Sequence, residues 1–313
     1  FALFGIGVAL FGIGTFPQVN AIADAAQLAF EVPKWATGLI LAVLVALITL
    51  GGIQSISRIS TKVVPFMAIL YVLTCFGVMY LHAEQLPAVV SQILNAAFTT
   101  TAATGGFAGA TMMLALQAGV ARGVFSNESG LGSAPIAAAA AKTDSCVEQG
   151  LVCMTGTFFD TIIICTMTGL SIVISGAWQN PDLEGVQITD AAFQHGLPFP
   201  SQVSSCILML CLIFFAFTTI LGWNYYGERC LVYLTGTTKW IKPYKIIYIA
   251  AIALAPFLSL EPIWLLADIT NALMIIPNLI AIIALRKVII GETKLYFSKR
   301  NEEKMSAAVK AVE

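Results

Sequence analysis

The sequence predicts an all-α polytopic membrane protein, and its composition is the first reason. Of the 313 residues, 58% are apolar, and the 16 Lys and Arg with the 17 Asp and Glu make up only 11%, against about 25% in an ordinary soluble domain. A soluble fold of this size needs more polar side chains to cover its surface, whereas a bilayer solvates apolar ones. The composition therefore excludes a water-soluble enzyme, and nothing in it is typical of nucleic-acid binding.

Apolar spans are the second reason. Seven stretches are close enough to the roughly 20 residues that cross a bilayer: 1–23, 36–53, 63–82, 149–176, 203–222, 243–260 and 263–285. The stretch 86–124 is also long enough, but it contains several threonines and a Gly-Gly pair, so we expect a broken span there. The sequence therefore predicts about eight transmembrane helices.

Proline and glycine mark the ends of these spans. Pro33 precedes the second span, Gly51 and Gly52 end it, and Pro65 is expected to open the third. Three further prolines lie inside apolar stretches, where the missing N–H and the ring clash break or kink a helix. They are Pro17, Pro256 and Pro277.

The basic residues orient the spans. With the loop that holds Arg58 and Lys62 inside, every Lys and Arg except Lys34 falls on the cytoplasmic side, which includes the charged tail 288–313. The stretch 177–201 has no Lys or Arg and is expected to be extracytoplasmic. The chain opens with Phe inside an apolar run that has no charged n-region, so we expect it to be a fragment of a longer protein.

The broken span carries the strongest indication of a binding site. Gly105, Gly106 and Gly109 flank Phe107 near its middle, so unwound backbone is expected there. Such a break presents N–H groups at one half-helix and carbonyls at the other, which suits the carboxylate and ammonium of an amino acid. The alternative is close helix packing through small residues.

Two further pairs of polar residues lie in apolar helices. Thr218 and Thr219 offer adjacent hydroxyls, and a hard cation such as sodium needs several oxygen ligands; alternatively, each hydroxyl bonds back to a carbonyl one turn earlier. Gln18 and Asn20 lie where the first span turns polar, and they are expected either to hydrogen-bond a substrate or to bond the backbone.

Acidic residues inside the spans are the remaining candidates. Asp160 is the clearest intramembrane carboxylate, a group that is functional by default as a proton relay, an ion ligand or the partner of a buried hydroxyl. Asp268, with Asn271 and Asn278, makes part of the last span polar. Hydrogen bonding between helices is the alternative for both carboxylates. We find no nucleophile with a base, no phosphate loop and no metal-ligand spacing among the cysteines, which argues against an enzyme.

The motif GVARGVFSNESGLGSAPIAAAAAKT, with QGLVCMTGTFFDTIIICTMTGL after it, resembles the alanine or glycine:cation symporter family of prokaryotes, the sodium:alanine symporters. The resemblance continues through FGIGTFPQVNAIA and FAFTTILGWNYYGE and covers Phe1 to about Lys287. The family belongs to the amino acid, polyamine and organocation superfamily. The resemblance therefore implies a five-plus-five inverted repeat like that of the leucine transporter, of which 1–287 holds core helices three to ten without the first two.

The resemblance also implies roles for single residues. The candidate substrate-binding residues are Gln18, Asn20, Gly105, Gly106, Phe107, Gly109 and Trp223. Thr218 and Thr219 resemble a hydroxyl pair that contributes to a sodium site in sodium-coupled relatives. Asn127 and Glu128 fall in a loop expected to be cytoplasmic, where the resemblance implies a structural or gating role.

Together these expectations describe a secondary active symporter of the prokaryotic cytoplasmic membrane. It would carry a small neutral amino acid, alanine or glycine, with sodium as coupling ion and no other cofactor, by alternating access. A proton-coupled transporter in which Asp160 titrates is one alternative. A channel or a non-transport membrane scaffold is another.

Overall fold

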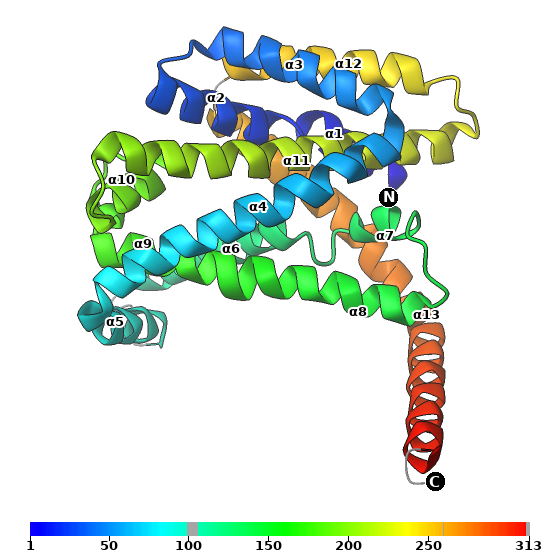
Figure 1. Ribbon diagram of the computed structural model, residues 1–313. Coiled ribbons are helices and arrows are strands. Elements are labelled where there is room, and N and C mark those ends of the chain that lie inside the picture. Colours follow the sequence, from blue (N-terminus) through cyan, green and yellow to red (C-terminus); the bar gives the residue numbers. More distant parts are fainter. Residues whose placement is uncertain (99–105, 259, 311–313) are drawn as a thin grey trace.

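The computed structural model describes residues 1–98, 106–258 and 260–310, and every regular element in these ranges is a helix (Figure 1). Five helical stretches of the described chain are long and apolar enough to cross a membrane: Ala2–Phe30, Gly52–Leu81, Cys146–Ser175, Ser201–Thr235 and Pro262–Glu302. Lys34–Leu50 is a shorter apolar helix. These findings support the predicted polytopic helical class, whereas the count of eight spans and the inverted repeat stay predictions.

The helices follow one another with short connections. The first half holds α1 (Ala2–Phe11), α2 (Phe16–Phe30), α3 (Lys34–Leu50), α4 (Gly52–Leu81), η1 (Ala83–Gln85), α5 (Leu86–Phe98), α6 (Gly106–Asn127) and α7 (Ala134–Ala138). The second half holds α8 (Cys146–Thr157), the π-helix η3 (Phe158–Cys165), α9 (Thr166–Ser175), η4 (Ala177–Gln179), α10 (Val186–Gly196), α11 (Ser201–Thr235), α12 (Ile241–Leu254), η5 (Ala255–Phe257) and α13 (Leu260–Lys310).

Of the boundaries predicted from single prolines and glycines, those at Pro33 and Gly51 agree with the structure and the one at Pro65 does not. Helix α3 begins directly after Pro33 and ends before Gly51, as expected. Helix α4, however, begins at Gly52 and runs through Pro65, so the expected loop around Arg58 and Lys62 is helical and that prediction was wrong. Hydropathy marks where a chain enters the apolar layer, and a helix can extend beyond that point into polar sequence.

Two of the three prolines that were expected to break or kink a helix lie next to a break. Helix α1 ends at Phe11 and α2 begins at Phe16, so Pro17 lies in the first turn of α2, where its missing N–H costs nothing. Helix α12 ends at Leu254, just before Pro256. Helix α13 continues past Pro277 without interruption.

The break between α1 and α2 is held by buried hydroxyls. Thr15 Oγ1 donates to the carbonyl of Ala9 at 2.5 Å, and the hydroxyl of Tyr248, on α12, lies 3.0 Å from the carbonyl of Gly14 and 2.8 Å from that of Ile220 on α11. In an apolar layer each freed backbone group needs such a partner. Tyr248 therefore fixes α12 against both the break and α11.

Helix α11 runs through the middle of the molecule, with α3 and α12 on one side of it and α8 on the other (Figure 1). It packs closely on α1 and on the break after it because glycines leave room: a Cβ added to Gly14 would lie 2.5 Å from Cβ of Trp223, and one added to Gly227 would lie 2.8 Å from Cβ of Ala9. These contacts bury Trp223 almost completely, with 1% of its surface exposed.

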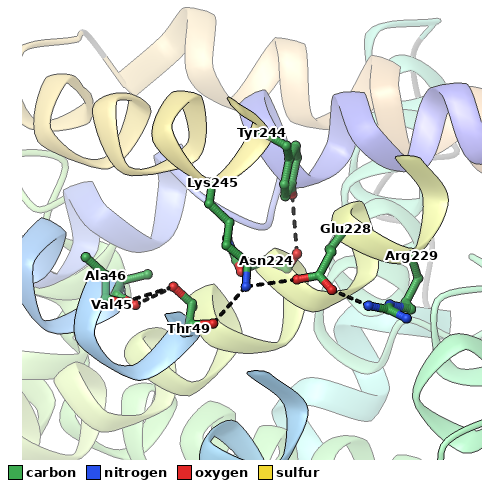
Figure 2. A network of polar contacts seen from close by, with 8 residues as sticks. All are labelled: Val45, Ala46, Thr49, Asn224, Glu228, Arg229, Tyr244 and Lys245. Atoms are coloured by element: carbon green, nitrogen blue, oxygen red, sulfur yellow. Dashed lines mark hydrogen bonds and ion pairs between the residues drawn. The ribbon is translucent and has the colours of Figure 1, made fainter. Parts of the chain in front are cut away.

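An ionic network joins α3, α11 and α12 (Figure 2). Nζ of Lys245 donates to a carboxylate oxygen of Glu228 at 3.1 Å and to the carbonyl of Thr49, in the last turn of α3, at 2.8 Å. Arg229 pairs with the same carboxylate. The side chains of Lys245 and Glu228 are only 15% and 9% exposed. A buried pair of this kind fixes the register of the helices, because removing either partner leaves an uncompensated charge.

We expect Tyr248→Phe to lower the free energy of unfolding by about 1–3 kcal/mol, the cost of leaving buried polar groups unpaired. Thermal unfolding in detergent measures this. Tyr233→Phe is the matched control, because Tyr233 lies on α11 and is 82% exposed. Equal effects of the two substitutions would contradict the role assigned to Tyr248.

Candidate functional site

A cavity of about 440 Å³ opens between α4, the end of α6, η3 and α11. Its polar lining consists of two carboxylates, five hydroxyls and one amide, from Glu128, Asp160, Ser60, Ser126, Thr157, Thr218, Thr219 and Asn127. Trp223 and Tyr226 form an aromatic wall. The cavity is therefore rich in oxygen, and no Lys or Arg is among the described residues that line it. Such a lining suits a cation.

Asp160 lies in the π-helix η3, a geometry that is frequent at functional sites. One of its carboxylate oxygens accepts hydrogen bonds from Ser126 at 2.8 Å and from Thr161 at 3.2 Å. A hydroxyl partner was one of the roles predicted for this carboxylate. In the described ranges no basic side chain forms an ion pair with Asp160. The carboxylate therefore faces the cavity without a protein counter-charge.

Thr218 and Thr219 line the same cavity from α11. The hydroxyl of Thr218 lies 3.0 Å from the carbonyls of both Phe214 and Phe215, and that of Thr219 donates to Phe215 at 3.0 Å. The predicted alternative, back-bonding to the helix, is thus what the structure has. Because a hydroxyl donates with its hydrogen and keeps its lone pairs, back-bonding leaves both oxygens able to accept a cation.

Glu128 and Trp223 form a second polar contact at the cavity. The indole Nε1 of Trp223 donates to Glu128 Oε1 at 2.9 Å, and Ser133 donates to Oε2 at 2.5 Å. Glu128 lies between α6 and α7, outside the five candidate spans. Burial raises the pKa of its carboxyl above the ordinary value, and the neighbouring charge of Asp160 adds to the rise. The two hydrogen bonds offset only part of this rise in pKa, because they favour the ionised form.

Two of the predicted substrate residues lie away from this cavity. Asn20 is buried, and its Nδ2 donates to the carbonyls of Phe16 at 3.2 Å and Ala255 at 2.9 Å, so it holds α2 against η5. Gln18 is half-buried on the same helix and does not line the cavity. The structure brings Thr218, Thr219 and Trp223 together with Asp160, but not with Gln18 or Asn20, whose substrate contacts stay a prediction.

The glycine-rich segment is described only from Gly106 onward. Gly105 and the side chain of Phe107 lie outside the described residues. Helix α6 begins at Gly106, so Gly106, Phe107 and Gly109 are in its first turn. The expected unwound backbone is therefore not found at these three positions, since their carbonyls enter a regular helix, although the N–H groups of its first turn have no partner within the helix. Their contact with substrate stays a prediction.

Asp268 has a partner that the sequence analysis did not assign. Its carboxylate oxygens both lie 2.5 Å from Nη2 of Arg122, on α6, and the guanidinium lies over the ring of Trp264 with 4.5 Å to its centroid. Asn278 donates to the carbonyl of Gly130 at 2.8 Å. The predicted alternative of helix-to-helix hydrogen bonding thus holds for Asp268. The sequence did contain an indication of this pair, since a lone Arg and a lone Asp inside apolar spans need partners.

Comparison with known proteins adds independent findings. A family model described as the sodium:alanine symporter family matches residues 1–310. The chain is 56% identical over 299 residues to an uncharacterised transporter of Haemophilus influenzae, covering 96% of this chain and 65% of that protein. It is 43% identical over 310 residues to the sodium/alanine symporter AgcS of Methanococcus maripaludis, covering 98% and 66%. It is 36% identical over 305 residues to a probable sodium/glutamine symporter, GlnT, of Bacillus subtilis, covering 97% and 62%.

We expect Gly14→Ala to displace Trp223 and lower the free energy of unfolding by about 1–3 kcal/mol, as overpacking does in a tight core. Gly7→Ala is the matched control on α1, because its added Cβ would meet only Thr270 at an ordinary 3.8 Å. Thermal unfolding in detergent compares the two. A Gly14→Ala protein as stable as the Gly7→Ala protein would show that Trp223 is free to move.

Proposed function

Because the chain belongs to the sodium:alanine symporter family, we propose that it carries a small neutral amino acid, alanine or glycine, together with sodium across the cytoplasmic membrane of a prokaryote. The chain spans 65% and 66% of the length of its first two relatives, so the proposal concerns the complete gene product. The C-terminal end of α13 lies on the cytoplasmic side in this proposal, in accord with the basic residues of the tail.

The cavity lined by Thr218, Thr219 and Asp160 is the observation that carries the proposal. Sodium binds through oxygen ligands, and the two hydroxyls present lone pairs while the carboxylate supplies charge. No described basic group competes for that charge within the lining. We assign the coupling sodium to this cavity.

The amino acid is proposed to bind beside sodium in the same cavity, against the indole of Trp223. The start of α6 lies far from this cavity, because the cavity meets α6 at Asn127 and the 22 residues from Gly106 to Asn127 rise about 33 Å along the helix axis. The substrate contacts predicted for Gly106, Phe107, Gly109, Gln18 and Asn20 are therefore not part of this proposal. The indole of Trp223 would fill the space that a longer side chain needs, which favours alanine and glycine.

Coupling follows from thermodynamic linkage. If sodium binds the outward-facing state more tightly, its occupancy favours the state that accepts the amino acid, and each ligand raises the affinity for the other by the same factor. The one rival that a specific observation favours is proton coupling. Asp160 faces the cavity without a described basic partner, so a proton could take the place of sodium there.

Labelled alanine uptake into vesicles that contain the complete gene product tests the proposal. We expect Thr218→Val and Thr219→Val each to raise the sodium concentration at half-maximal uptake by about tenfold, the effect of 1.4 kcal/mol of lost binding, with a smaller change in the KM for alanine. Thr74→Val is the matched control, because Thr74 also back-bonds within its helix, to Leu70 at 2.7 Å, but does not line the cavity.

Two results would contradict sodium coupling at this site. Uptake driven by a pH gradient without sodium, and lost in Asp160→Asn, would establish the proton-coupled alternative. Equal sodium curves for the Thr218, Thr219 and Thr74 variants would show that the pair only bonds its own helix.

A further inference from the structure

Glu128 is held in place from several sides. Its φ is 55°, in the left-handed region that residues other than glycine rarely adopt. Gly130 and Gly132, in the same loop, also have positive φ, and Leu131 between them is fully buried. A Cβ added to Gly132 would lie 2.8 Å from the Asn278 amide of α13. The loop is therefore packed against the core, and the strained backbone at Glu128 is fixed by its surroundings.

The carboxylate of Glu128 has two different partners. Oε2 accepts from Ser133, which is fully buried just before α7, and this bond stays within the loop. Oε1 accepts from the indole of Trp223 at 2.9 Å, and this bond crosses to α11. The first bond orients the carboxylate and the second extends that orientation to another helix.

The hydrogen bond from Trp223 to Glu128 orients an indole ring that lines the cavity. Its side chain packs on Gly14 at the break between α1 and α2, and its ring meets that of Tyr226 at 5.3 Å between centroids and 78° between planes. These apolar contacts restrict the position of the indole ring but do not determine where its N–H points. A buried indole N–H needs an acceptor, and Glu128 supplies it on the cavity side.

We propose that Glu128 is a positioning residue for amino-acid recognition: its carboxylate fixes the indole of Trp223 in the wall of the cavity and thereby sets the affinity for the amino acid, without itself binding sodium. This inference rests on the proposed function. It gives the loop between α6 and α7 a direct part in substrate affinity.

The length and the charge of this side chain can be separated by experiment. Glu128→Gln keeps the reach and an acceptor oxygen but removes the charge. Glu128→Asp keeps the charge but withdraws the carboxylate by one methylene, and Asp tolerates the left-handed region better than Glu does. We expect Glu128→Asp to raise the KM for alanine uptake by about tenfold, as the loss of a hydrogen bond does, and Glu128→Gln to raise the KM less, because it weakens the bond but keeps an acceptor for the indole N–H.

Trp223→Phe completes a double-mutant cycle, because it removes the N–H and keeps an aromatic ring. Trp223→Phe alone should raise the KM for alanine, and adding Glu128→Asp to it should raise the KM no further, since the two act through one hydrogen bond. Thr74→Val is the matched control: it removes a hydroxyl that donates to Leu70 within its own helix and does not line the cavity, and the KM should stay near that of the unaltered protein.

The inference is overturned if Glu128→Gln raises the KM more than Glu128→Asp, or if the effects of Glu128→Asp and Trp223→Phe add. A rise confined to the sodium concentration at half-maximal uptake in Glu128→Gln would instead make Glu128 an ion ligand. Absence of sodium-dependent alanine uptake by the unaltered protein, at normal amounts in the membrane, would overturn the proposed function itself, so the two failures are distinguishable.

Discussion

The need to pair every backbone group at the break between α1 and α2 governs the arrangement of the surrounding helices. Thr15 and Tyr248 place hydroxyls at the carbonyls that the break frees, and in an apolar solvent no water can replace them. Tyr248 follows Lys245 by one turn of α12. The helix whose tyrosine bonds the break is therefore also held by the ion pair between Lys245 and Glu228. Moving any one of these helices would leave a buried polar group without a partner.

Charged residues next to the described helices differ in what faces them, as two cross-helix ion pairs and Asp160 show. Arg122 with Asp268, and Lys245 with Glu228, are paired across helices and fix their relative positions. Asp160 has hydroxyl partners but no ion pair, and it faces the cavity. The first arrangement suits a scaffold, because a paired charge loses stability when its partner moves. The second suits a transiently bound cation, because Asp160 has no protein counter-charge in the described ranges and a bound cation can supply one and then dissociate.

Some of the site could be predicted from the sequence because its signals are local. A hydroxyl pair or a carboxylate inside an apolar run is visible without knowledge of any neighbour, and Thr218, Thr219 and Asp160 do line one cavity. Asn20 gave the same kind of signal but packs α2 against η5. Glu128 does lie in a loop, and its own stretch of sequence did not indicate its partner, because Trp223 is 95 residues away.

The sequence by itself determined the helical membrane class, the family resemblance and the helix ends at Pro33 and Gly51, because composition, motifs and proline positions act within one or two turns of the chain. Only the tertiary structure decided which polar groups serve the scaffold and which face the cavity. That choice depends on partners far apart in sequence, since Arg122 meets Asp268 and Trp223 meets Glu128 only after the helices pack. A polar side chain in an apolar layer has to find a partner, but its own neighbours in sequence do not say which one.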